Sequence, residues 1–538
     1  MSDQTETTET ARIAPWWKGA TIYQIYPRSF QDTTGDGIGD LNGITQRLDY
    51  VASLGVQAIW ISPFFTSPMV DFGYDVADFC DVDPIFGTLV DFDALVEKAH
   101  SLGLKVTIDQ VYSHTSDQHA WFEESRRSRD NAKSDWYVWA DAKADGTPPN
   151  NWQSVFGMGA WEWDARRGQY YLHNFLREQP DLNLHNPEVQ DAILDVTRFW
   201  LDRGVDGFRL DALNFGMHDR ALTDNPVETE FKRPPTRPFD FQRHSNNMSQ
   251  PEIVPFIQRI RSVIDSYDRE VFTVAEVGGP RPLVEMKSFT QSDHRLNSAY
   301  AFDFLYADAL TADLVRKTQR EWPGEPGEGW PSWAFENHDA PRAVTRWRGD
   351  CPPDRYSKLL ALLLTALRGN AFVYYGGELG LMQGEIAFED LKDPEAITNW
   401  PETLGRDGAR TPMPWDGTGN DYAGFSEAKP WLPMQDHHKA YSVMDQEADP
   451  QSVLNIQRAI ISLRNGCEIL RLGDIQFDGE GALLVFDRVW NGRTRRCVFN
   501  LTSQALPYAG PAVSDFTVGE AVQNGKISAY SGFVSSVL

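Results

Sequence analysis

The sequence contains few cysteines, and none of them is spaced for pairing or for metal binding. The four cysteines of the 538 residues lie far apart, and no two have C-x-x-C spacing. A zinc knuckle and a redox dithiol both need closely spaced thiols, so neither is indicated. Four isolated thiols suit a reducing compartment.

Hydrophobic runs long enough to cross a bilayer, about 20 residues, are also missing. The first 14 residues are polar and acidic, without the basic start and apolar stretch of a signal peptide. We therefore expect a protein that has no membrane segment and stays in the cytoplasm. Residues 1–14 are expected to form a disordered tail.

Basic charge is scarce relative to acidic charge. Lysine and arginine number 50 and aspartate and glutamate 77, which gives a formal net charge of −27. Such a surface is a poor partner for nucleic acid or anionic lipid, whereas neutral ligands are not penalised. Aromatic residues make up 12% of the chain, with 18 tryptophans. Most of these rings belong to the core, but some can line a site for neutral, polyhydroxylated ligands.

Short apolar runs rich in β-branched and aromatic residues recur along the chain, as expected for buried parallel strands. The predicted strands are residues 21–26, 58–63, 105–111, 207–212, 271–277, 299–304, 332–337 and 371–376. Between them lie amphipathic patterns that predict helices at 44–54, 89–102, 187–203, 251–268 and 355–368.

Eight strands alternating with helices predict an α/β fold of the (β/α)8 TIM-barrel type. A doubly wound open sheet is the alternative, but no G-x-G-x-x-G or G-x-x-x-x-G-K-[ST] motif follows any predicted strand. The rhythm breaks after the third strand, which indicates an inserted small domain B at 113–177. The barrel then comprises 15–112 and 178–455, and turn-separated strand patterns predict an antiparallel β domain at 456–538.

Acidic residues stand at the ends of several predicted strands. Asp109, Asp211 and Glu276 close the third, fourth and fifth strands, and His338 and Asp339 follow the seventh. The carboxyl ends of barrel strands carry the active site, and a buried cluster of like charges is costly unless it is used. Metal binding and glycoside hydrolysis could each use such a cluster, and the histidines lack the H-x-H or H-E-x-x-H spacing of common metal sites.

Seven segments resemble the α-amylase family, glycoside hydrolase family 13, in its oligo-1,6-glucosidase and α-glucosidase branch. They are IYQIYPRSF (22–30), DQVYSH (109–114), QPDLN (179–183), GFRLDA (207–212), AEV (275–277), ENHD (336–339) and ARTPMPWD (409–416). The resemblance implies that Asp211 is the nucleophile, Glu276 the general acid/base and Asp339 the third carboxylate, which stabilises the transition state. Because neighbouring parallel strands lie about 5 Å apart, Asp211 and Glu276 can flank one sugar carbon.

The same resemblance implies a set of substrate-binding residues around the carboxylates. Arg209 would pair with the nucleophile, and Asp71 and Arg410 would together grip the non-reducing end and close the pocket. The remaining predicted contacts are Tyr74, Asp109, His114 and His338, with Phe156 and Phe175 as candidate pocket walls that could equally be core residues.

The acidic loop DTTGDGIGD at 32–40 is a candidate metal site. The resemblance implies a structural cation, Ca²⁺ with Mg²⁺ as the alternative, and a turn without metal is also open. The predicted ligands are Asp32, Thr34, Asp36, the carbonyl of Ile38, and Asp40. Oxygen ligands at alternate residues are typical of calcium loops, although the closing glutamate of an EF-hand is missing.

We therefore expect a retaining, exo-acting α-glucosidase that also transfers glucose to alcohols and sugars. Maltose-like α-1,4 substrates are preferred in this interpretation because Ala212, after the nucleophile, replaces the Val of α-1,6 or the Thr of α-1,4 enzymes in the family. Sucrose is a further candidate. The partners expected are small α-glucosides, without nucleic acid or membrane, and the chain acts as a monomer or homodimer.

Four alternatives compete with this interpretation. A trehalose-forming isomerase is disfavoured because NHDAPR (337–342) resembles the glucosidases instead. A non-enzymatic homologue of the transporter-associated kind would carry a membrane segment and lack part of the carboxylate set, and neither applies. A sucrose-isomerising enzyme would carry an RLDRD-type loop, which is absent. An endo-acting amylase would not close the pocket as Asp71 and Arg410 are expected to do. The proline-containing segment 219–250 is expected to wall off the leaving-group side.

Overall fold

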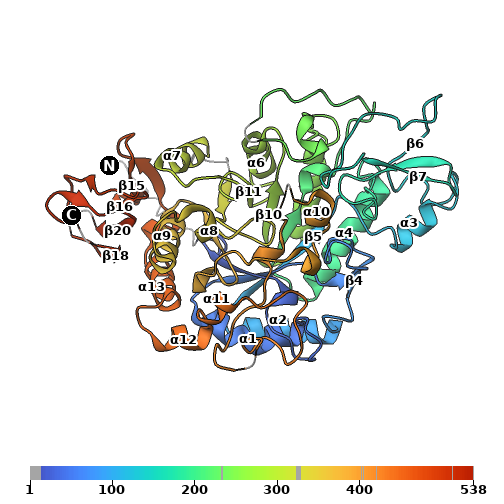
Figure 1. Ribbon diagram of the computed structural model, residues 1–538. Coiled ribbons are helices and arrows are strands. Elements are labelled where there is room, and N and C mark those ends of the chain that lie inside the picture. The colour runs from blue at the N-terminus through green and yellow to red at the C-terminus, as the bar shows by residue number, and fades with distance from the viewer. Residues whose placement is uncertain are drawn as a thin grey trace, which may run out of the picture.

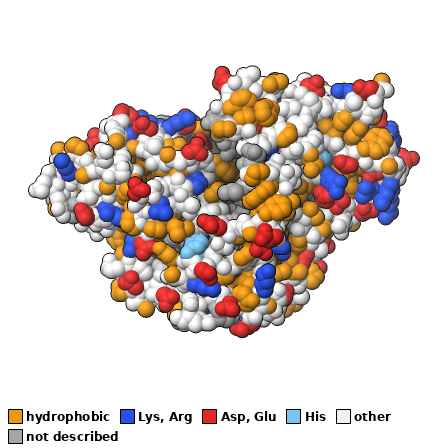
Figure 2. Space-filling model, viewed as in Figure 1, with side chains coloured by type: hydrophobic (Ala, Val, Ile, Leu, Met, Phe, Trp, Pro, Cys, Tyr) orange, Lys and Arg blue, Asp and Glu red, His pale blue; other side chains and the backbone are white. Residues whose placement is uncertain are grey.

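The structure is a computed structural model that describes residues 14–231, 234–322, 329–401, 403, 405–419, 421–511, 513–520 and 522–536. The predicted disordered tail, apart from Ala14, lies outside the described residues. No helix within the described ranges is long and apolar enough to span a bilayer. Figure 2 shows acidic side chains spread over the viewed face, in keeping with the net charge of −27.

Eight parallel strands close into a barrel in the order β1-β2-β5-β9-β10-β11-β12-β13, with β13 pairing back to β1. The predicted TIM barrel is therefore confirmed, and the doubly wound sheet is excluded. Its strands are β1 Thr21–Ile25, β2 Ala58–Ile61, β5 Lys105–Val111, β9 Gly207–Asp211, β10 Phe272–Val277, β11 Ser298–Ala301, β12 Trp330–Trp333 and β13 Asn370–Tyr374.

The barrel strands are buried on both of their faces. Every residue of β1, β2, β9, β10, β12 and β13 is buried, which explains their continuous apolar runs. The seventh strand begins two residues earlier and ends four residues earlier than predicted. Pro331 within β12 obscured the pattern, since a proline normally argues against a central strand.

Helices follow the strands and cover the barrel (Figure 1). They are α1 Leu41–Ser53, α2 Leu89–Ser101, α4 Pro187–Asp202, α5 Ile253–Ile264, α6 Pro282–Thr290, α7 Ala312–Glu321, α8 Ala343–Trp347 and α9 Pro353–Ala366. Side-chain caps fix several of their starts. Asp40 caps α1, Asn186 caps α4, and Thr88 with Asp91 forms a capping box on α2.

Residues between β5 and α4 form a separate small sheet, as expected for an inserted domain. β6 Trp139–Ala140, β8 Gln169–Leu172 and β7 Trp161–Asp164 pair antiparallel, preceded by α3 Ala120–Ser125. Trp152 and Trp161 stack in its own small core. A second short pair, β3 Phe65–Thr66 with β4 Asp78–Val82, brings the segment with Asp71 and Tyr74 over the barrel end.

The chain finishes in an antiparallel five-stranded sheet, confirming the predicted C-terminal β domain. Helix α13, Val453–Asn465, packs against α9 and leads into it through α14, Glu468–Leu472. The sheet order is β14 Asp474–Phe477, β15 Leu483–Trp490, β16 Arg493–Asn500, β20 Ser531–Ser536 and β18 Phe516–Val518. In Figure 1 this sheet and the inserted strands β6 and β7 lie at opposite ends of the molecule.

The described residues between β13 and α13 form short helices, among them α10 Pro394–Asn399, α11 Asp436–Lys439 and α12 Val443–Ala448. Its residues return to the carboxyl end of the barrel, where Met413 N bonds Ser29 O at 2.8 Å and Tyr375 donates to Thr411 O at 2.7 Å. This segment therefore belongs to the same face as the strand ends with the acidic residues.

Candidate active site

Two neighbouring strands deliver the predicted nucleophile and acid/base to the same level of the barrel. β9 and β10 pair in register with Leu210 opposite Ala275, so Asp211 and Glu276 are the next positions along. Strands in a sheet lie about 4.8 Å apart, which brings the two carboxyl groups close together. Ala212 N donates to Glu276 Oε2 at 3.3 Å and thereby connects the end of β9 to the acid/base.

A single guanidinium group holds the acidic cluster together. Arg209 Nη1 lies 2.5 Å from Asp211 Oδ1 and 2.8 Å from Asp109 Oδ1, and its Nη2 lies 2.5 Å from Glu276 Oε1. Its Nε donates to the hydroxyl of Tyr300 at 3.0 Å. Arg209 is completely buried. The pairing predicted with Asp211 thus includes Asp109 and Glu276 as well.

Burial and charge together set the protonation of the pair. Burial raises the pKa of Glu276 to about 7 despite Arg209, with help from the charges of Asp211 and Asp339. Burial likewise raises the pKa of Asp211 to about 7 against the opposing charge of Arg209. Two carboxyl groups that interact this strongly lose their protons in separate steps, so the pair keeps one proton around neutral pH.

The third carboxylate, Asp339, belongs to a different electrostatic environment. Arg410 Nη2 donates to Asp339 Oδ1 at 2.9 Å, Arg406 Nη1 lies 3.4 Å from the same oxygen, and His338 Nε2 lies 3.2 Å from Oδ2. Burial opposes its ionisation, but the positive charge around it, which includes the two guanidinium groups, lowers the pKa of Asp339 below its ordinary value. Asp339 is therefore ionised whenever the enzyme is folded near neutrality.

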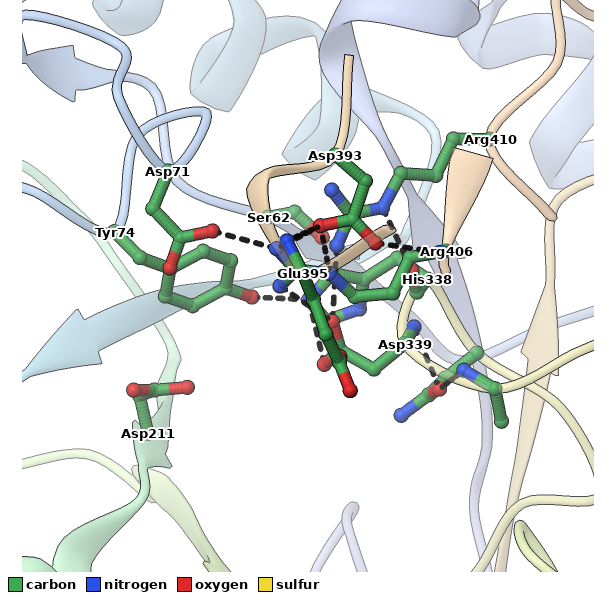
Figure 3. Close-up of polar contacts among 12 residues, drawn as sticks. Ser62, Asp71, Tyr74, Asp211, His338, Asp339, Asp393, Glu395, Arg406 and Arg410 are labelled. Carbon is green, nitrogen blue, oxygen red and sulfur yellow. Dashed lines mark hydrogen bonds and ion pairs between the residues drawn. The ribbon is translucent and has the colours of Figure 1, made fainter. Parts of the chain in front are cut away.

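His338 itself remains neutral because burial lowers its pKa to about 3. Its ring stacks on Tyr74 with centroids 5.4 Å apart, and its Nε2 lies 2.5 Å from the Tyr74 hydroxyl. Tyr74 also donates to Asp109 Oδ2 at 3.2 Å. These contacts bring three of the predicted substrate residues into one layer at the barrel end, as Figure 3 shows for Tyr74 and His338.

Asp71 and Arg410, which are predicted to grip the non-reducing end together, each pair with another residue. Asp71 Oδ1 pairs with Arg406 Nη2 at 2.7 Å, whereas Arg410 pairs with Asp339 and donates to His338 O at 2.7 Å. Arg406 also lies 3.4 Å from Asp339 and binds Asp393, so Arg406 and Asp339 connect Asp71 to Arg410 (Figure 3). Asp211 lies apart from this cluster in the same view.

Arg406 and Asp393 are thus site residues that the sequence did not indicate. Arg406 stands four residues before Arg410 in the segment GRDGAR, and this spacing was the available signal. Asp393 caps the start of α10, and Lys392 N and Asp393 N both donate to the buried Asp407. These links hold the segment after β13 against the pocket.

The glutamine of QPDLN supports two further predicted residues. Gln179 Nε2 donates to Asp71 Oδ2 at 3.2 Å and lies 3.2 Å from His114 Nε2. Burial lowers the pKa of His114 to about 3, so this imidazole is neutral as well. Phe175 packs on His114 with ring centroids 5.0 Å apart, and the Arg406 guanidinium lies 5.3 Å from the centroid of the Phe156 ring. The two phenylalanines therefore both lie at the site.

The metal loop is ordered by its own hydrogen bonds. Asp32 accepts hydrogen bonds from the backbone of Thr34, Gly35 and Gly37 and from the hydroxyl of Ser426. Asp36 accepts from Ile38 N, and Asp40 from Gly43 N and Thr33. In the part of the chain that the structure describes, no group of three or more His, Cys, Asp or Glu is gathered as a ligand set. The donors are of the oxygen type that calcium prefers, but their arrangement does not fit a preformed site, so calcium stays a prediction.

A closed (β/α)8 barrel with a carboxylate pair and a third carboxylate at its strand ends defines a barrel-type glycoside hydrolase. Residues 24–473 match the family described as the α-amylase catalytic domain, and the chain belongs to this family, in its branch of α-glucosidases and oligo-1,6-glucosidases.

Relatives and solved structures agree with this assignment. A probable α-glucosidase of Rhizobium meliloti (strain 1021) is 53% identical over 91% of this chain and 90% of its own. An oligo-1,6-glucosidase of Heyndrickxia coagulans is 39% identical, with 93% and 94% covered. The crystal structure of an α-glucosyl transfer enzyme, XgtA, superposes with a TM-score of 0.92 at 49% identity, covering 97% of this chain and all of that one.

Conservative removal of either paired carboxyl group should leave the fold intact and stop turnover. Asp211→Asn and Glu276→Gln keep the shape of each side chain but remove the nucleophile and the proton donor. We expect hydrolysis of an activated aryl α-glucoside to fall by roughly 10²–10⁴-fold in each variant, with little change in thermal stability. Near-normal activity of Asp211→Asn would show that the nucleophile is assigned wrongly.

The pH profile separates the two roles. Since Glu276 must be protonated when substrate arrives and burial raises its pKa to about 7, kcat/KM of the wild type should fall as the pH rises through that value. With a leaving group that needs no protonation, the residual activity of Glu276→Gln should lack this alkaline limb. An unchanged alkaline limb would assign it to another group.

Proposed function

We propose that this protein is a retaining, exo-acting α-glucosidase for disaccharides and small α-glucosides, which also transfers glucose to alcohols and sugars. The observation that carries the proposal is the buried Arg209, which binds both members of the carboxylate pair, Asp211 and Glu276. We also propose that it works in the cytoplasm.

The carboxylate pair supports a double displacement at the anomeric carbon. Asp211 attacks this carbon while Glu276 gives its proton to the departing glycosidic oxygen, so that a covalent glucosyl-enzyme forms and the leaving sugar departs as an alcohol. Glu276, now a carboxylate, takes a proton from water, and the water oxygen displaces Asp211 with restoration of the α-configuration. An alcohol or sugar hydroxyl in place of water gives transfer by the same step.

Ion pairs close the non-reducing end of the pocket, which supports exo-action. The pairs Asp71–Arg406 and Asp339–Arg410 involve guanidinium groups that are almost entirely buried. A polymer chain cannot pass through this end without breaking both pairs. A terminal glucose can instead replace parts of these hydrogen bonds with its own hydroxyl groups.

The segment 219–250 supports a narrow leaving-group side. The Trp152 indole of the inserted domain donates to Thr223 O at 2.8 Å, and Arg237 Nη1 donates to Val155 O at 2.8 Å. The same nitrogen lies 2.9 Å from Glu395 on α10. The segment is thus tied both to the inserted domain and to the residues after β13, and in this proposal it excludes all but the first sugar on the leaving-group side.

Chain length is the experiment that tests this function. An aryl α-glucoside, whose only glucose is the bound ring, should release α-glucose first in a time-resolved NMR assay, because the mechanism retains configuration. Along the series maltose, maltotriose and maltotetraose, kcat/KM should fall steeply, because segment 219–250 excludes the third sugar. A flat or rising series would show that this segment does not restrict the site, and initial release of β-glucose would exclude the double displacement.

Linkage preference should follow the small residue after the nucleophile. Ala212 has left-handed backbone geometry (φ 39°), and its methyl group is smaller than the Val or Thr side chain found there in the family. We expect a higher kcat/KM for maltose than for isomaltose, by an amount on the order of 1–3 kcal/mol in transition-state stabilisation. Ala212→Val should move the ratio toward isomaltose, whereas backbone strain would slow both substrates alike. A wild-type preference for isomaltose would contradict the assignment.

We also propose that the loop at 32–40 takes up one structural Ca²⁺, with Mg²⁺ as the alternative. The support is the resemblance and the oxygen-rich loop, in which Asp36 remains exposed to incoming cations. Elemental analysis after dialysis should find about one calcium per chain, and chelation should lower the melting temperature of the wild type but not of Asp36→Asn with Asp40→Asn. A protein without bound metal and with no response to chelator would favour the metal-free turn.

A further inference from the structure

Three buried asparagines form a hydrogen-bonded chain that ends on an aspartate. Asn225 Nδ2 donates to Asn247 Oδ1 at 2.9 Å, and Asn247 Nδ2 donates to Asn174 Oδ1 at 2.8 Å. Asn174 then donates its side-chain and backbone N–H groups to the two oxygens of Asp181. The four side chains, here called the amide ladder, belong to residues that are at most 3% exposed.

The inner end of the amide ladder lies in the wall of the substrate pocket. Asp181 belongs to the QPDLN segment, two residues after Gln179, which binds Asp71 and His114. Asn174 directly precedes the pocket phenylalanine Phe175, and its backbone oxygen accepts a hydrogen bond from Val155 N at 2.8 Å. A displacement of Asn174 therefore shifts the walls beside the glucose-binding residues.

The outer end lies in segment 219–250. Asn225 and Asn247 lie near its beginning and its end and are among its buried residues, with His244 and Met248. Asn151 of the inserted domain exchanges two hydrogen bonds with the backbone of Asn225, at 2.8 and 2.9 Å. The amide ladder thus joins both ends of the segment to the pocket wall.

The hydrogen bonds of the amide ladder all run in one direction, so each amide depends on the orientation of the one before it. Both Asp181 oxygens accept from Asn174, which fixes the orientation of that amide and hence of the next two. Aligned bonds of this kind strengthen one another, and an apolar side chain in the middle takes away the partner that Asn225, Asn174 and His244 each have on Asn247. Asn247 occupies this middle position.

We propose that Asn247 is the positioning residue of the leaving-group wall, which sets the length of substrate that the enzyme accepts. It acts through Asn174 and Asn225 and does not touch the sugar. The inference rests on the proposed role of segment 219–250. In it, Asp181 of the QPDLN segment couples segment 219–250 to the glucose pocket.

Asn247→Leu, which keeps the size of the side chain, tests the inference because it removes the hydrogen bonds to Asn225 and Asn174 and the contact with His244 Nδ1. Hydrogen exchange should rise within 219–250 and not in the barrel strands. The ratio of kcat/KM for maltotriose to that for maltose should rise about tenfold, through KM for maltotriose, as one relaxed pocket wall predicts.

Asn246→Ala is the matched control. Its side chain bonds only Asp224 O, and its backbone N–H still reaches Asn225. This variant should behave as the wild type in exchange and in the substrate ratio. If Asn247→Leu does not fold, Asn225→Ala removes the outermost rung instead and should give the same two changes.

The outcomes separate this inference from the function it rests on. A folded ladder variant with wild-type exchange in 219–250, or one that slows maltose and maltotriose equally, overturns the inference. A flat substrate series in the wild type overturns the restricting role of the segment. In that case, hydrogen exchange of the ladder variant that rises only within 219–250 still supports the amide ladder as the anchor of this segment. Unchanged exchange overturns both the anchoring role of the ladder and the restricting role of the segment.

Discussion

The site depends on one fully buried guanidinium group placed among acidic side chains. Arg209 takes two carboxylates on one nitrogen and a third on the other, and without it Asp109, Asp211 and Glu276 would be a cluster of uncompensated like charges. Removing one partner of a buried ion pair costs about 3–5 kcal/mol, a large part of the stability of a typical domain. Asp339 lies beside two other guanidinium groups and is ionised, whereas burial raises the pKa of both Asp211 and Glu276. Asp211 and Glu276 therefore share one proton near neutral pH, so an acid and a nucleophile can stand side by side in one pocket.

Around this centre the pocket is built from segments that are distant in sequence and held by side chains. The loop with Asp71, the inserted domain and the stretch after β13 meet at Arg406, which binds Asp71, Asp339 and Asp393. The barrel supplies rigid strand ends, and the loops supply the walls. This division explains how close relatives on the same barrel can act on different linkages, because the walls can change without disturbing the carboxylates.

The sequence predicted the barrel and the three carboxylates because both leave local signals. A buried strand is a continuous apolar run, and a catalytic acid at its end stands next to that run, as Asp211 and Glu276 do. The missed elements lack such signals: α7 buries Arg316, Thr318 and Gln319 beside Val315, so its inner face is not an apolar stripe. The link from Asp71 to Arg410 through Arg406 could not be predicted, since it depends on side-chain reach across more than 300 residues of chain. The amide ladder could not be predicted from the sequence, because each asparagine alone is typical of a turn.

Closure of the barrel has a consequence for how the enzyme is made. β1 is hydrogen-bonded to β13, which is synthesised some 350 residues later. Until then, this edge of β1 has no strand to pair with. At about 5–20 residues per second on the ribosome, that wait lasts tens of seconds. During it β1 presents an open, apolar edge, the kind of surface to which other chains add. The helices and the inserted sheet can form earlier from local contacts, whereas the pocket, which needs Asp71 and Arg410 together, exists only once the ring is closed. The nascent chain therefore depends on cellular protection of its first strand in a way that the finished barrel, which has no free edge, does not.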